Sequence, residues 1–146
     1  MVFVQWESKY VLGIRIIDEQ HKYLFDLTNE LYEKCHLGEN AVHDQFIKTL
    51  HMMVKYVTVH FTAEEKIMEQ IGYPRIAEQK EQHAAFTKKV IEESQKFASG
   101  MAGVPQDLVH FLRDWLVSHI AVYDKGLADY IHHQRKSGAT NLPEGL

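Results

Sequence analysis

Residues that interrupt helices are scarce in this chain, whose 146 residues include 3 prolines and 8 glycines. Proline lacks a backbone donor, and glycine is entropically costly inside a helix, so long stretches without either residue favour helices. No segment alternates apolar and polar residues over enough length to indicate a sheet. The sequence therefore predicts an all-α fold.

Apolar residues recur at helical spacing in four segments, which is typical of amphipathic helices. We expect these helices at about residues 18–38, 41–71, 74–98 and 105–133. Asp18 is the expected N-cap of the first helix, and Gly38, Gly72-Tyr73-Pro74 and residues 99–103 are the expected breaks between helices. Short connections of this kind predict an antiparallel up-down-up-down four-helix bundle.

Both ends of the chain lack helical periodicity. We expect residues 1–17 to form an extended arm that contacts the bundle through Trp6, Val11, Leu12 and Ile14. Residues 134–146 contain Ser137-Gly138 and Pro143-Glu144-Gly145, which indicates a flexible C-terminal tail. The prediction is one domain over residues 1–133, followed by this tail.

Charge and composition exclude several classes of protein. Lys and Arg number 16 against 20 Asp and Glu, a net charge of −4, and no basic block suits a phosphate backbone, so nucleic acid is not an expected partner. No apolar stretch is long enough to cross a bilayer. Residues 1–6 lack the features of a secretory signal, and the single cysteine, Cys35, cannot close an internal disulfide. We therefore expect a cytoplasmic protein.

Histidine occurs 10 times and outnumbers glycine. Four of the histidines lie on the apolar stripes of four different predicted helices: His21, His60, His83 and His119. Glu64 follows His60 by four residues, about 40° around a helix, so both side chains point the same way. Asp124 follows His119 by five residues, about 140° away. Asp124 can reach inward only by pointing at a different atom from His119, or through a local widening of the helix, a π-bulge.

Glu64 and Asp124 need compensation on these inward faces, because burying an unpaired charge is costly. The neighbouring inward turns carry no Lys or Arg, and neutral imidazoles supply no charge. Two divalent cations bridged by both carboxylates would neutralise them and engage every histidine, and imidazole with carboxylate suits iron. The alternative, in which all four histidines are structural, is disfavoured because they lie on four separate helices.

The other histidines are expected in solvent; they are His36, His43, His51, His110, His132 and His133. Competing metal motifs are nearly absent, since the ferritin-like Glu-x-x-His pattern occurs only once, at Glu33–His36. Apolar side chains near these polar residues can wall an apolar pocket, although ordinary core packing is expected for most of them: Phe25, Phe61, Phe86, Trp115, Ile120 and Val122.

Several motifs together resemble bacterial hemerythrin. They are Trp6, Ile17–Lys22 (IDEQHK), His60–Met68 (HFTAEEKIM), Gly72–Pro74 (GYP), His83–Phe86 (HAAF), and Trp115–Ile120 (WLVSHI) with Asp124. The resemblance runs from Trp6 to about Tyr130. It implies a non-haem centre of two iron ions, with a bridging oxide or hydroxide, that binds O₂ as a hydroperoxide for storage, delivery or sensing.

Carried over by position, the resemblance implies six ligands: His21 and His60 on one iron, His83 and His119 on the other, and Glu64 and Asp124 as bridges. O₂ would bind the iron held by His21 and His60. The family has a further histidine four residues before the position of His83, where this chain has Gln79.

Gln79 leaves two interpretations open. Its amide oxygen can bind iron as a weaker ligand than imidazole, or the position is left to water. We expect weaker iron retention and a shorter-lived O₂ adduct. An alternative function is a di-iron oxidase, peroxidase or nitric-oxide-handling enzyme, and a third is a metal-poor interaction module. The redox partner is not indicated.

Overall fold

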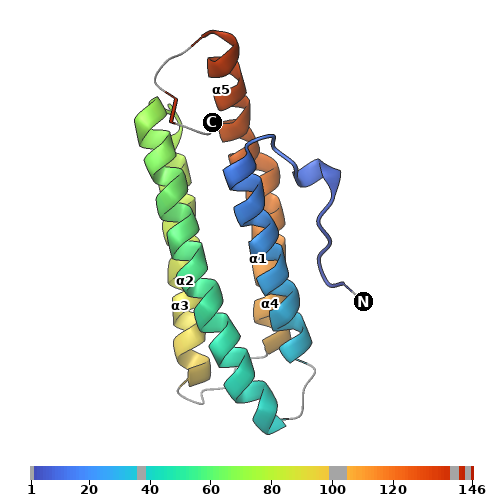
Figure 1. Cartoon of the computed structure of the whole chain (residues 1–146). Coiled ribbons are helices and arrows are strands. Elements are labelled where there is room, and N and C mark those ends of the chain that lie inside the picture. Colours follow the sequence, from blue (N-terminus) through green and yellow to red (C-terminus); the bar gives the residue numbers. More distant parts are fainter. Residues whose placement is uncertain (1, 36–38, 99–104, 139–141, 144–145) are drawn as a thin grey trace.

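A computed structural model of the chain describes residues 2–35, 39–98, 105–138, 142–143 and 146, without the side chains of residues 39–43, 97–98 and 105. In these parts of the chain it contains helices and no strands, which confirms the all-α prediction. Four rods lie side by side and alternate in direction, as expected (Figure 1). The helices are α1 (Arg15–Lys34), α2 (Glu39–Ile71), α3 (Ile76–Ala98), α4 (Pro105–His119) and α5 (Lys125–Lys136).

The fourth rod consists of α4, the π-helical turn η2 (Ile120–Asp124) and α5. The backbone stays helical at both junctions, with φ −63° and ψ −45° at His119 and φ −61° and ψ −41° at Lys125. The Lys125 N–H reaches the Ile120 carbonyl five residues earlier, which is the π-helical hydrogen bond. This turn is a π-bulge, one of the two ways in which the sequence predicted that Asp124 could point inward.

The first helix begins earlier than predicted. Ile14, not Asp18, is the N-cap of α1, and its side chain makes no capping bond. Asp18 instead lies in the first turn, where its Oδ1 accepts from the Leu12 N–H at 2.9 Å and its Oδ2 from the Gly13 N–H at 3.1 Å. The carboxylate therefore fixes the segment that enters the helix, at a terminus where the helix dipole favours negative charge.

The N-terminal arm runs along the outside of the bundle (Figure 1) and contains a short 3-10 helix, η1 (Ser8–Tyr10), so it is not extended throughout. The Val4 N–H donates to Asn29 Oδ1 at 2.8 Å, and Asn29 Nδ2 donates to the Val4 carbonyl at 2.9 Å. Three of the four expected apolar contacts form, but Val11 is 51% exposed, which corrects its predicted placement on the bundle.

Buried apolar side chains form two clusters at different heights of the bundle. Along α1, Ile17 belongs to one cluster and Leu24 to the other, and the buried His21 lies between them. The same order holds along α2 and the fourth rod. A layer of buried polar residues therefore separates the two apolar clusters.

The C-terminal segment differs in part from the expected tail. The helix α5 continues to Lys136, three residues past the predicted end of the fourth helix at His133. Leu142 and Leu146 pack against the apolar cluster next to α5, and Arg135 Nε donates to the Leu146 carbonyl at 2.8 Å. The flexibility of the remaining tail stays a prediction.

Other expectations have mixed outcomes. His51 and His110 are exposed, as expected, but His132 is half-buried, and its Nε2 donates to the Leu12 carbonyl at 2.7 Å. The predicted breaks at Gly38 and residues 99–103, together with His36 and the side chain of His43, lie outside the described residues. Across the described parts of the chain, no helix is both long and apolar enough to span a membrane.

Candidate metal centre

The polar layer brings together every site residue predicted from the sequence. It receives side chains from α1, α2, α3, α4 and the end of η2, and none of them is more than 3% exposed. The seven residues are His21, His60, Glu64, Gln79, His83, His119 and Asp124. Helical spacing predicted the four histidines and Glu64, whereas Asp124 required the π-bulge and Gln79 was singled out through the family resemblance.

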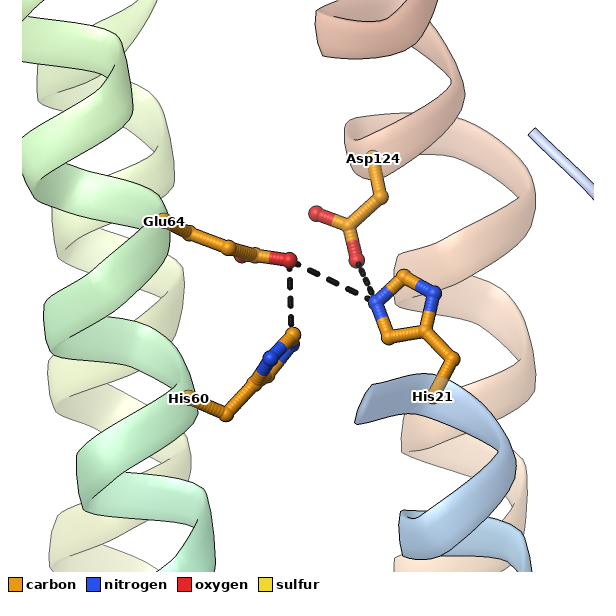
Figure 2. A group of neighbouring side chains, drawn as sticks. All are labelled: His21, His60, Glu64 and Asp124. Atoms are coloured by element: carbon orange, nitrogen blue, oxygen red, sulfur yellow. Dashed lines mark ion pairs between the residues drawn. The ribbon is translucent and has the colours of Figure 1, made fainter. Parts of the chain in front are cut away.

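One group of four residues joins α1, α2 and η2 (Figure 2). Glu64 Oε1 lies 2.9 Å from His60 Nε2 and 3.4 Å from His21 Nε2. Asp124 Oδ2 lies 3.0 Å from His21 Nε2. One ligand atom from each of the four residues lies within 4.8 Å of the others, which is close enough for all four to hold one cation.

A second group uses the same two carboxylates together with His83 and His119. Glu64 Oε2 lies 3.3 Å from His83 Nε2, and Asp124 Oδ1 lies 3.3 Å from His119 Nε2. The two Nε2 atoms are 3.2 Å apart. Each carboxylate therefore turns one oxygen to each pair of histidines, which is the arrangement that bridges two cations.

Unpaired polar atoms indicate that the site is built for metal. Both Glu64 carboxylate oxygens, Asp124 Oδ2 and the Nε2 atom of His21 are buried without a hydrogen bond of acceptable geometry. Buried polar atoms without partners are rare because each costs free energy. Divalent cations would engage these converging oxygen and nitrogen atoms, and the mixed imidazole and carboxylate set suits iron. The residues present therefore fit a two-metal centre.

The electrostatics of the site hold both carboxylates ionised. Burial alone would raise the pKa of Glu64, but the charge of His60 and the contacts of the other imidazoles keep this pKa well below its ordinary value. Burial and the charge of Glu64 raise the pKa of Asp124, yet His119 and His21 overcome them and lower it to about 2. Burial lowers the pKa of His21, whereas contacts with the carboxylates raise it to about 9. In the metal-free protein, protons on imidazole balance the carboxylates, and cations would replace those protons.

Two outer residues orient the histidines of α2 and α3. Gln20 Oε1 accepts from His60 Nδ1 at 2.6 Å, and Glu65 Oε2 accepts from His83 Nδ1 at 3.0 Å. Partners of this kind fix the tautomer and turn Nε2 toward the metal position. Sequence reasoning missed both, although each is the chain neighbour of a predicted ligand, and that adjacency is a signal.

Aromatic rings pack against the imidazoles of the second group. Trp115 stacks on His119, with centroids 4.4 Å apart and planes 12° from parallel. Phe61 stacks on His83 at 3.8 Å and 2°. These faces hold the imidazoles in place and keep water away from them.

The expected apolar pocket forms only in part. An apolar cavity of about 10 Å³ lies beside the polar layer, and its lining includes Phe61, Phe86 and Trp115. Phe25 and Ile120 belong to the ordinary core. Val122 is 55% exposed, which corrects its predicted place in the wall, because it points away from the bundle on η2.

Comparisons with known proteins agree with this geometry. Residues 12–131 match the family model described as Hemerythrin HHE cation binding domain. A bacteriohemerythrin of Methylococcus capsulatus is 33% identical over 126 residues, which cover 86% of this chain and 94% of that protein. A bacteriohemerythrin of Pseudomonas aeruginosa is 31% identical over 145 residues, covering 99% of this chain and 92% of its relative.

A solved structure supports the same assignment. The crystal structure of a wild-type hemerythrin superposes with a TM-score of 0.79 at 33% identity, covering 84% of this chain and 93% of that one. Sequence and architecture therefore agree over most of both chains. This chain belongs to the hemerythrin family.

Proposed function

We propose that this protein is a non-haem di-iron oxygen-binding protein that stores, delivers or senses O₂. The observation that carries the proposal is the orientation of the two carboxylate oxygens of Glu64 and of Asp124. Each carboxylate faces one histidine pair with one oxygen and the other pair with its second oxygen. When bound, two ferrous ions would supply the electrons that O₂ binding requires and that these side chains cannot provide.

The assignment of ligands follows the two groups. His21 and His60 would hold one iron, His83 and His119 would hold the other, and both ions would share Glu64 and Asp124. Two bridging carboxylates supply two negative charges, which offsets half of the charge of two divalent cations in a layer closed to solvent.

The protein surrounds this layer with apolar and aromatic groups that exclude water. Phe61 and Trp115 lie directly on imidazoles, and a small apolar cavity lies beside them. Exclusion of water limits proton leakage and side reactions at a site that handles O₂. This environment favours reversible binding.

The test uses protein loaded anaerobically with ferrous salt. We expect two iron ions per chain and a visible absorption band that develops with O₂ and disappears when O₂ is removed. The control variant, Glu64→Ala, should lose most of the iron, because it removes an oxygen from both groups. Substoichiometric iron in the unaltered chain, or a spectrum that does not respond to O₂, would overturn the proposal.

An enzyme is the second candidate, and Gln79 is the observation that favours it. With one imidazole fewer than the family pattern, the site would hold its metal less tightly and would leave a coordination position open. Nitric oxide or peroxide could occupy that position. Sustained consumption of either compound with a chemical reductant would support the enzyme, whereas stoichiometric binding without turnover supports the carrier.

We also propose a cytoplasmic location. The thiol of Cys35 is 8% exposed, and burial raises its pKa to about 11, so it is an unreactive core residue. A free thiol is compatible with a reducing compartment. Fractionation of cells that produce the native chain tests this location directly.

A further inference from the structure

Gln79 occupies the α3 position where the family resemblance implies a histidine ligand, and it makes two specific contacts there. Its Nε2 donates to the Tyr123 carbonyl at 3.0 Å and to Asp124 Oδ1 at 3.3 Å. The side chain is 1% exposed, and its Oε1 is buried without a partner. Gln79 therefore contacts one of the shared carboxylates directly.

The chemistry of the two partners determines which end of the amide faces the site. Both are oxygen acceptors, so the NH₂ group must face them. Turning the amide over would place Oε1 against two oxygens, and both hydrogen bonds would be lost. An amide nitrogen has no free lone pair with which to bind a cation, so the atom that Gln79 presents to Asp124 is not a ligand.

We infer that Gln79 is a positioning residue that holds Asp124 and the π-helical turn, and that it is not a third metal ligand of the His83 and His119 group. This inference rests on the proposed di-iron function. The amide of α3 bonds both the backbone of η2 and the carboxylate at the end of that turn. One side chain therefore fixes both the turn and the direction of Asp124.

The inference changes the expected symmetry of the centre. With Gln79 outside the ligand set, each cation has two imidazoles and shares the same two carboxylates. The ion beside His83 and His119 then has one nitrogen donor fewer than the arrangement implied by the resemblance. Relative to that arrangement, the ion would gain a position for a small ligand.

The first experiment needs no metal. Hydrogen exchange of backbone amides in residues 120–128 is measured in the metal-free chain, in Gln79→Leu and in Gln95→Leu, whose altered residue is exposed on the same helix. Loss of the Gln79 hydrogen bonds should accelerate exchange in this segment by about 5-fold, and the control should leave it unchanged. Equal exchange in Gln79→Leu and the unaltered chain would overturn the positioning role.

The second experiment counts ligands. Cobalt(II) is titrated into the unaltered chain, Gln79→Leu and Gln79→His, and X-ray absorption at the cobalt edge counts nitrogen and oxygen neighbours. We expect Gln79→Leu to keep the ligand count and to bind cobalt about 10–100-fold more weakly, as for other residues that orient metal ligands. Gln79→His should add one imidazole to the multiple-scattering signal, even where it displaces water and the total count stays the same, and should restore tight binding.

Two results would contradict this assignment: loss of a neighbour in Gln79→Leu, or no added imidazole signal in Gln79→His. Absence of cobalt binding by the unaltered chain has a different meaning. That outcome overturns the proposed di-iron function together with any ligand count, whereas the exchange experiment still decides whether Gln79 holds η2 and Asp124.

Discussion

Gln20 and Glu65 act on the centre through the outer nitrogens of His60 and His83. Because a hydrogen bond to Nδ1 fixes which nitrogen is free to bind metal, the ligand geometry depends on residues that never touch the cation. These contacts join different helices, so they depend on how the helices pack. Sequence periodicity predicted which histidines face the interior but carried no information about the partner of each ring.

At this scale, the Gln20→Ala variant should bind ferrous or cobalt ions about 10–100-fold more weakly, because His60 loses the oxygen that accepts its Nδ1 proton. Calorimetric titration measures the affinity, and circular dichroism confirms that the helices remain. Gln45→Ala, at an exposed site on α2, is the matched control. An affinity equal to that of the unaltered chain would show that Gln20 does not orient His60.

Titration of His21 gives the metal-free protein a pH-dependent stability. Its pKa rises from an ordinary value of 6.5 to about 9, so its contribution is full below pH 6.5 and is lost as the pH rises through 9. The pKa of Asp124 falls from 3.8 to about 2, so its contribution is lost as the pH falls toward 2. Thermal melts of metal-free protein should therefore show Tm falling between pH 6.5 and 9. The exposed-site variant His51→Asn should retain this slope, and a flat profile in the unaltered chain would contradict it.

At the scale of elements, spacing predicted the rods well and their starts less well. The interval from His119 to Asp124 left two ways for Asp124 to point inward on the predicted helix, and the structure uses the π-helical turn. The N-cap was misplaced because Asp18 suits that position by residue type, whereas the structure uses its carboxylate to bind the preceding backbone. The capping preference of aspartate could not distinguish an N-cap from a first-turn residue that binds the preceding backbone.

The entry into α1 also supplies a stability prediction. Gly13 has φ +80°, and a Cβ there would lie 3.0 Å from Nε2 of His132, which bonds the neighbouring Leu12 carbonyl. Gly13→Ala should lower the free energy of unfolding by about 1–3 kcal/mol, measured by urea denaturation. Gly138→Ala is the control, because φ is +74° there but no atom lies within 4 Å of the added Cβ. Equal costs at the two positions would show that the contact with His132 adds nothing.

For the whole molecule, the buried polar layer couples metal binding to folding. Cations that bind only the folded chain stabilise it by mass action, by about 2.7 kcal/mol when free metal exceeds Kd 100-fold. Addition of a chelator should lower Tm by roughly 5–10 °C for a chain of this size. Calorimetry of loaded and chelated protein measures the shift. The His60→Ala variant should show a much smaller difference, and an equally large one would place the stabilising metal elsewhere.

The separation of the apolar interior into two clusters has a consequence for the lifetime of the protein. The polar layer between the two clusters contributes little apolar packing, and it is the layer that iron would fill. We therefore expect a copy without metal to open most readily at this layer. Cellular proteases cut chains that open, and they would remove empty copies ahead of filled ones. The abundance of the protein would then follow the supply of iron without any dedicated regulator.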